Sequence, residues 1–186
     1  MKMLKRLMLP LIVVCGVPIV MAADNAIEDH PGYVDFSGLT AIANIAPTVE
    51  ISLKAPLLNM ITNLIRNEDV EAADFISKLM RVTVNVFEST AIDVDEIASS
   101  MTSIADDLDK EGWERVVRVR EDESHVDIYF RLSEDSMIIH GIAIMVAEPT
   151  ETVLVNIVGD ISVDDLSAVG RRFDIDELVD IDVSDI

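Results

Sequence analysis

The chain has 186 residues, half of them hydrophobic, and its 35 acidic and 14 basic residues give a formal net charge of −21 at pH 7. This length suits one domain with a sizeable hydrophobic core. A chain with this much negative charge is not expected to bind nucleic acid or anionic lipid through its overall electrostatic field. The composition therefore excludes proteins that bind these ligands through a net positive charge.

The N-terminus has the organisation of an export signal. A short basic region precedes an apolar run over residues 7–21, which is short for a membrane span and contains two prolines. Val20 and Ala22 supply the small side chains that signal peptidase requires. We therefore predict a signal peptide over residues 1–22, a cut between Ala22 and Ala23, and a periplasmic or secreted protein.

The single cysteine, Cys15, leaves a second form of export open. In a lipoprotein this thiol would carry lipid and attach the domain to the outer membrane. Val14, however, is bulkier than the small residue that normally precedes a lipidated cysteine. A cut after Ala22 removes Cys15 and leaves a mature chain without a thiol or a disulfide. The outer-membrane lipoprotein is therefore kept as the alternative to a free domain.

Residues 23–47 form a polar lead-in to the first predicted element. Alternating apolar residues predict a strand over residues 48–53, and Pro56 suits the first turn of the helix that follows it. A second helix is expected from about Asp69. Alternation returns over residues 81–87 and predicts another strand.

A longer helix is predicted between Asp93, a suitable N-cap, and Gly112, a suitable C-cap. Ser162 and Asp165 suit the start of a last helix that runs to about Phe173. Between these helices, short acidic turns join four predicted strands in the manner of hairpins. The four strands cover residues 113–120, 125–132, 137–146 and 152–161.

This order of elements predicts an α+β fold, a mostly antiparallel sheet of five or six strands with helices packed on one face. We expect a single domain over residues 48–173 and an acidic C-terminal tail over residues 174–186. Alternation in the strand over residues 125–132 places Phe130 toward the core and Asp127 and Tyr129 on the opposite, open face.

Arginine is concentrated on the predicted strands, whereas acidic residues dominate the helices, turns and tail. Guanidinium groups pair well with carboxylates, so we expect the open face to bind a protein or acidic peptide segment of the envelope, the C-terminal tail included. The alternative is a set of cross-strand ion pairs with acidic neighbours. The candidate partner-binding residues are Arg81, Arg118, Arg120, His125, Asp127 and Arg131.

Enzymatic chemistry has little support in the sequence. No motif places a serine or cysteine nucleophile beside a base, and pairs of carboxylates arise by chance among 35 acidic residues. We expect no cofactor. The enzymatic alternative is a hydrolase that uses a carboxylate, or a metal held by His125, Asp127 and His140.

Three segments resemble a known bacterial family, the domain of unknown function 4252. They read HPGYVDF from His30, PTVEISLKAPLL from Pro47 and VLVNIVGDISVDDL from Val153, and the resemblance extends to about Phe173. It implies a small exported domain, often a lipoprotein, with no established activity and a connection to envelope-stress regulation. With the export signal, it favours a binding or regulatory module of the bacterial cell envelope without an identifiable catalytic activity.

Overall fold

The fold is taken from a computed structural model that describes residues 27–36, 46–88, 94–121, 124–162 and 164–167. For residues 94–98 it describes the backbone and not the side chains. The predicted signal peptide, with Cys15, Ala22 and Ala23, lies outside the described residues. The Asp93 cap and the 174–186 tail also lie outside them. No helix within the described ranges is long and apolar enough to cross a membrane.

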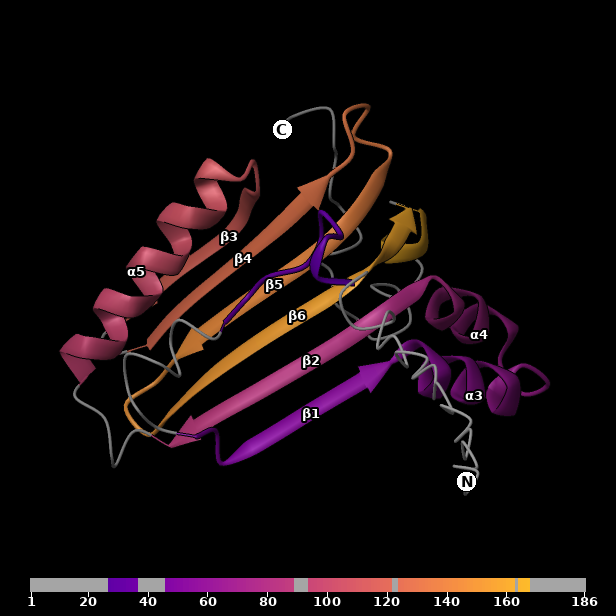
Figure 1. The fold of residues 1–186 in the computed structure, drawn as a ribbon, viewed down its shortest axis with the longest axis horizontal. Coiled ribbons are helices and arrows are strands. Elements are labelled where there is room, and N and C mark those ends of the chain that lie inside the picture. Colours follow the sequence, from indigo (N-terminus) through magenta and orange to yellow (C-terminus); the bar gives the residue numbers. More distant parts are fainter. Residues whose placement is uncertain (1–26, 37–45, 89–93, 122–123, 163, 168–186) are drawn as a thin grey trace, which may run out of the picture.

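Six antiparallel strands form one sheet in the order β1-β2-β6-β5-β4-β3, which confirms the predicted α+β class (Figure 1). Consecutive hairpins join β3 to β6, and β2 then pairs with β6 on its other side. The strands are β1 (Val49–Lys54), β2 (Leu79–Glu88), β3 (Glu114–Glu121), β4 (Ser124–Leu132), β5 (Ile138–Ala147) and β6 (Glu151–Ser162).

In the described part of the chain, three helices of eight or more residues lie around this sheet. The pair α3 (Ala55–Ile65) and α4 (Val70–Ser77) connects β1 to β2 at one end of the strands, and α5 (Val94–Lys110) packs on one face over β3 and β4 (Figure 1). As predicted, Gly112 ends α5: it has a φ of 80°, and the next N–H donates to the Leu108 carbonyl. The face of the sheet that carries α5 is called the α5 face below.

A short N-terminal segment, residues 27–36, also lies on the α5 face and is called the strap. Its backbone passes so close to β5 that a Cβ built on Gly32 would overlap the His140 carbonyl. Asn156 of β6 fixes the strap, because its side chain accepts from the Val34 N–H at 3.1 Å and donates to the Gly32 carbonyl at 3.0 Å. The strap lies within the predicted lead-in of residues 23–47, and these contacts make it part of the folded domain.

Buried side chains lie on both faces of the sheet. On the α5 face, Val34 and Phe36 of the strap and three residues of α5 pack on β4, β5 and β6. On the opposite face, Leu166 from a helical turn at residues 164–167 and Phe75 of α4 cover one end of the strands. As predicted, Ser162 and Asp165 cap that turn by reciprocal hydrogen bonds.

The predicted sides of β4 need correction. Asp127 and Tyr129 were expected on an open face, yet they are 3% and 0% exposed beneath α5. Alternation separates the two faces of a strand, but it does not say which of them is covered when both carry apolar residues. Arg118 and Arg120 donate hydrogen bonds to the Asp127 carboxylate, and Arg115 Nη1 donates to the Tyr129 hydroxyl at 3.1 Å, which makes the burial of both side chains possible.

Candidate functional site

The face opposite α5 is lined by apolar side chains from all six strands and is called the apolar face. Paired residues of an antiparallel sheet point to the same side, so the register defines rows that cross the sheet. One row consists only of valines, in the order Val49, Val86, Val153, Val146, Val126 and Val119. The next row is Ile51, Val84, Val155, Ile144, Ile128 and Val117.

No charged side chain interrupts these two rows. A third row begins with Leu53, Val82 and Ile157 and then reaches Ile142 and Phe130, which are buried beside Leu166. The valine row, by contrast, belongs to neither buried cluster of the described residues. Its two ends and the end of the second row are open to solvent, with Val49 44%, Ile51 43% and Val119 38% exposed.

Local sequence explains why this face forms. Alternating β-branched residues in each strand favour the extended backbone and place apolar side chains along one face of the strand. The same alternation puts Glu50, Ser52 and Lys54 of β1 on the α5 face. Because all six strands have the same character in register, the alternation of separate strands becomes one continuous surface.

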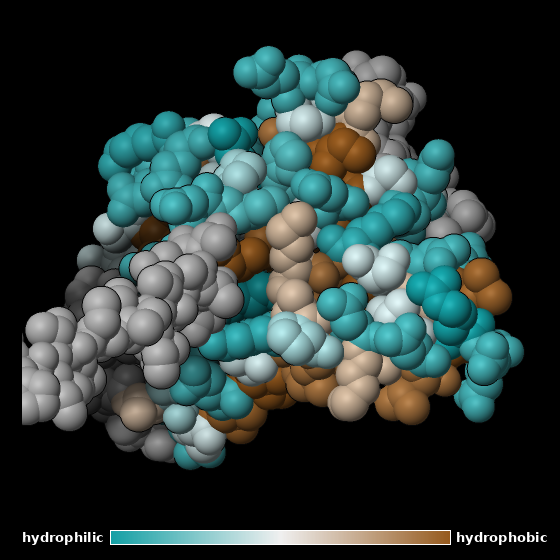
Figure 2. All heavy atoms as spheres, turned by 45° about the vertical axis from the view of Figure 1, so that its right-hand side comes forward, coloured by the Kyte–Doolittle hydropathy of each residue, from teal (hydrophilic) through white to brown (hydrophobic). Residues whose placement is uncertain are grey.

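The apolar face has an acidic border at one end. One step beyond the valine row, the same side of the sheet carries Glu88, Glu151 and Glu121, and all three are exposed. More exposed apolar residues lie on the helices at the other end of β1, namely Leu57, Met60 and Leu64 of α3 and Val70 of α4. Figure 2 brings that side forward and shows hydrophobic residues there and along the lower margin among hydrophilic ones.

The predicted arginine surface lies at the β3–β4 edge of the α5 face. Arg118 Nε donates to one carboxylate oxygen of Asp127 at 3.0 Å, and Arg120 Nη2 donates to the other at 2.6 Å. Burial alone would raise the pKa of Asp127, but the hydrogen bonds from the two arginines outweigh it and hold the pKa below its ordinary value. These contacts match the cross-strand ion pairs of the alternative interpretation.

A cavity of about 210 Å³ lies beside this ion-pair cluster, beneath α5. It is lined by three arginines and by three aspartates, Asp106, Asp109 and Asp127. Because the charges balance and the guanidinium groups of Arg118 and Arg120 already hold a carboxylate, the cavity offers little attraction to a further anion. His125 also lines it, and its Nδ1 is buried without a hydrogen-bond partner among the described residues.

The other two predicted arginines lie apart from this cluster. Arg131 donates to the Gly112 carbonyl at 2.9 Å and so holds the end of α5 against β4. Arg81, on β2, lies over the ring of Tyr33 in the strap at 5.9 Å. The structure thus brings together Arg118, Arg120, His125 and Asp127, whereas Arg81 and Arg131 contact other parts of the chain.

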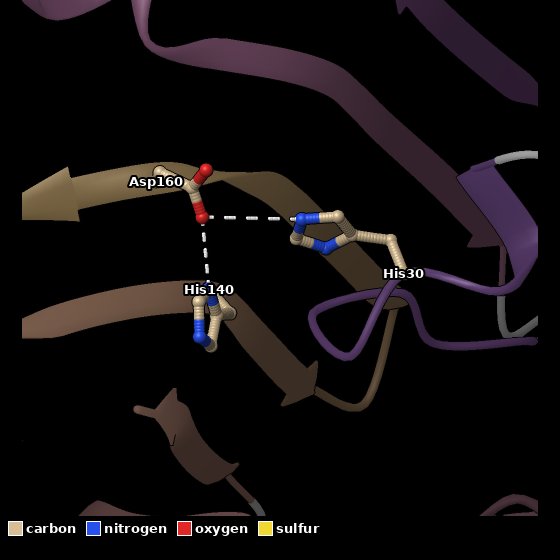
Figure 3. Close-up of side chains that lie close together, drawn as sticks. All are labelled: His30, His140 and Asp160. Atoms are coloured by element: carbon tan, nitrogen blue, oxygen red, sulfur yellow. Dashed lines mark hydrogen bonds and ion pairs between the residues drawn. The ribbon is translucent and has the colours of Figure 1, made fainter. Parts of the chain in front are cut away.

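The metal set considered for a hydrolase is not formed. His125 pairs with Ala147 at one end of β5, while His140 lies near the other end of that strand, about 23 Å away at about 3.3 Å per residue. His140 instead meets His30 of the strap and Asp160 of β6 (Figure 3). One possible ligand atom from each of these three lies within 4.8 Å of the others.

The cluster of His30, His140 and Asp160 holds the strap to the sheet. Asp160 Oδ1 lies 2.8 Å from His140 Nδ1 and 4.0 Å from His30 Nε2. Burial lowers the pKa of His30 and outweighs the charge of Asp160, which raises it. Sequence reasoning missed this cluster because His30 is more than a hundred residues from its partners; the HPGYVDF segment was its one signal.

The hydrogen bonding of His30 favours a proton over a metal ion on its Nε2 atom. The Gly32 N–H donates to His30 Nδ1 at 3.1 Å, so Nδ1 is the unprotonated nitrogen and a neutral ring carries its proton on Nε2. A metal on Nε2 would require the proton on Nδ1, where it would face the Gly32 N–H. The three residues therefore do not fit a metal ion without breaking the turn at residues 30–32.

Comparison with known proteins gives a family and no activity. The family model described as Domain of unknown function (DUF4252) matches residues 46–169, about two thirds of the chain. The chain therefore belongs to this family, as the resemblance predicted. No curated protein and no solved structure matches the chain.

Proposed function

We propose that this member of the DUF4252 family is an exported binding module of the bacterial cell envelope, and that the apolar face is its binding surface. The observation that carries the proposal is the pair of uninterrupted apolar rows across all six strands. Contiguous apolar surface of this kind is uncommon on a domain that works alone, and where it occurs it marks an interaction site.

The arginine cluster supports the choice of surface by exclusion. Asp127 already occupies the guanidinium groups of Arg118 and Arg120, so an acidic peptide would have to displace a buried carboxylate. A partner of the apolar face displaces only water. Burial of apolar surface is the main source of affinity in protein association, and it needs no charge complementarity.

Export is tested by the processed N-terminus and by fractionation of the cells that make the protein. A chain that begins at Ala23 and is found in the periplasm or medium supports the free, exported form. A lipidated N-terminus at Cys15 in the membrane fraction supports the tethered form. A chain that keeps its signal segment in the cytoplasm would contradict both.

Binding is tested by crosslinking in intact cells. A photoreactive amino acid is placed at Val84, on β2 in the second row of the apolar face, or at Ser103, an exposed position of α5 that serves as the matched control. We expect a discrete adduct from position 84 and none from position 103, and mass spectrometry identifies the partner. Equal adducts from both positions, or none from either, would contradict the proposal.

A further inference from the structure

We infer that the partner of the apolar face is a second copy of this chain, so that two sheets pack face to face in a symmetric dimer. The inference rests on the proposed function, because it identifies the occupant of the same surface. It follows from the shape of that surface, its size and the charges at its border.

The shape of the apolar face suits another sheet. The side chains stand in straight rows about 6.6 Å apart along the strands and about 4.8 Å apart across them. A second copy presents the same spacing, and two twisted sheets pack with their strands about 30° apart, so that their inner side chains interdigitate. Valine and isoleucine make up both rows and have few rotamers, so little side-chain entropy is lost on packing.

The size of the face predicts a reversible dimer. Two rows on six strands cover about 29 Å by about 13 Å, so two such faces together have a flat projected area of about 750 Å². Ile128 and Ile144 already pack against the Leu166 cluster and contribute less of this area than the other positions. The open parts of the third row, with Leu53 and Val82, add to this. This area is smaller than the roughly 1,200–2,000 Å² of stable complexes and falls in the range of weak, transient contacts, so we expect dissociation in the micromolar range or above.

The acidic border determines how the two copies are oriented. Glu88, Glu151 and Glu121 lie at one end of the apolar face, beside the valine row. A two-fold axis parallel to the strands would bring both borders together, where like charges repel. An axis that runs across the strands, in the plane between the sheets, places each border over the opposite end of the other copy. The dimer therefore uses the second axis.

The test compares two neighbouring positions of β1 that point to opposite sides of the sheet. Ile51→Lys puts a charge on the apolar face at a position that is already 43% exposed, and Glu50→Lys puts the same side chain on the α5 face. Sedimentation of the processed full chain is measured across the micromolar range. We expect the unchanged protein and Glu50→Lys to dimerise, and Ile51→Lys to dimerise at least about tenfold more weakly, because a lysine would be buried.

A second measurement keeps the inference testable if Ile51→Lys does not fold. A cysteine at Val155, in the centre of the second row, is labelled with a maleimide at low and at high protein concentration, with Ser103→Cys on α5 as the control. Dimerisation slows labelling at position 155 as concentration rises and leaves position 103 unchanged.

Other results overturn the inference in distinguishable ways. A monomer at every concentration with rapid labelling at position 155 refutes the second copy but leaves the face open to the partner of the proposed function. A monomer in which position 155 is always protected shows that the chain covers its own face, and both proposals then fail. A dimer weakened equally by Glu50→Lys and Ile51→Lys places the contact elsewhere.

Discussion

Asn156 gives the strongest stability prediction, because one buried side chain joins the strap to the centre of the sheet. It is 2% exposed, and it bonds the Val34 N–H, the Gly32 carbonyl and the Ile142 carbonyl at 3.1, 3.0 and 3.3 Å. Asn156→Ala leaves the two strap groups without partners, and each buried unpaired group costs about 1–3 kcal/mol. We expect a loss of about 4 kcal/mol in the free energy of unfolding.

The assay is urea denaturation followed by the fluorescence of Trp113, the single tryptophan of the chain. Its indole ring is 3% exposed and lies beside Gly141, where the strap crosses β5. The signal therefore reports release of the strap as well as global unfolding, and limited proteolysis of the strap separates the two events. A strap that opens first would give two transitions in place of one.

Asn85→Ala is the matched control, because Asn85 is a half-buried asparagine on the same face in the neighbouring part of β2. We expect it to cost under about 1 kcal/mol. Asn156→Asp keeps an acceptor for Val34 but turns a carboxylate toward two carbonyl oxygens, so it should be less stable at neutral pH and recover on acidification. A loss for Asn156→Ala no larger than that for Asn85→Ala would refute the assigned role.

Three further predictions concern the same face. Gly32→Ala places a methyl group against the His140 carbonyl and should increase proteolysis of the strap at unchanged far-ultraviolet circular dichroism, whereas equal proteolysis would disprove the close crossing. Asp127→Asn should cost about 1–2 kcal/mol at neutral pH, since the two arginines are half exposed. The lowered pKa of Asp127 means that its contribution is present above the ordinary pKa of 3.8 and is lost as pH falls through the lower folded pKa, so the variant should have a flatter acid limb in pH-dependent denaturation. The lowered pKa of His30 has the corresponding effect near neutrality, so the free energy of unfolding should fall as pH drops from 6.5 through the folded pKa, and His30→Gln should remove that slope. Added zinc should leave the melting temperature unchanged, because the Gly32 N–H donates to His30 Nδ1. A zinc-dependent rise in the melting temperature would overturn this hydrogen-bond assignment.

The order and type of elements could be predicted because each strand and helix has a local pattern. Alternation marked the strands, and Gly112 and Ser162 marked helix ends that hydrogen bonds in the structure bear out. The apolar face could not be predicted in the same way. Each strand showed its own apolar side, but only the pairing of β2 with β6, which are separated by four elements, joins those sides into rows.

Polar residues were the harder case. Asp127 looked like a surface residue because carboxylates are rarely buried, and only the approach of Arg118 and Arg120 from β3 makes its burial possible. The arginines themselves were recognised as a group, but their partner was inside the domain. The contact between His30 and Asp160 depends on the strap crossing the sheet, which no local pattern encodes.

The strap has a consequence for the order in which the molecule is assembled. The Gly32 carbonyl bonds a side chain 124 residues later in the chain, so the first described residues to be synthesised cannot settle until β6 exists and has paired with β5 and β2. Contacts this distant in sequence are slow to form and leave apolar strands unpaired meanwhile. If the chain crosses the membrane N-terminus first, the strap therefore cannot pack until β6 has also crossed, and folding is completed only when translocation is nearly finished.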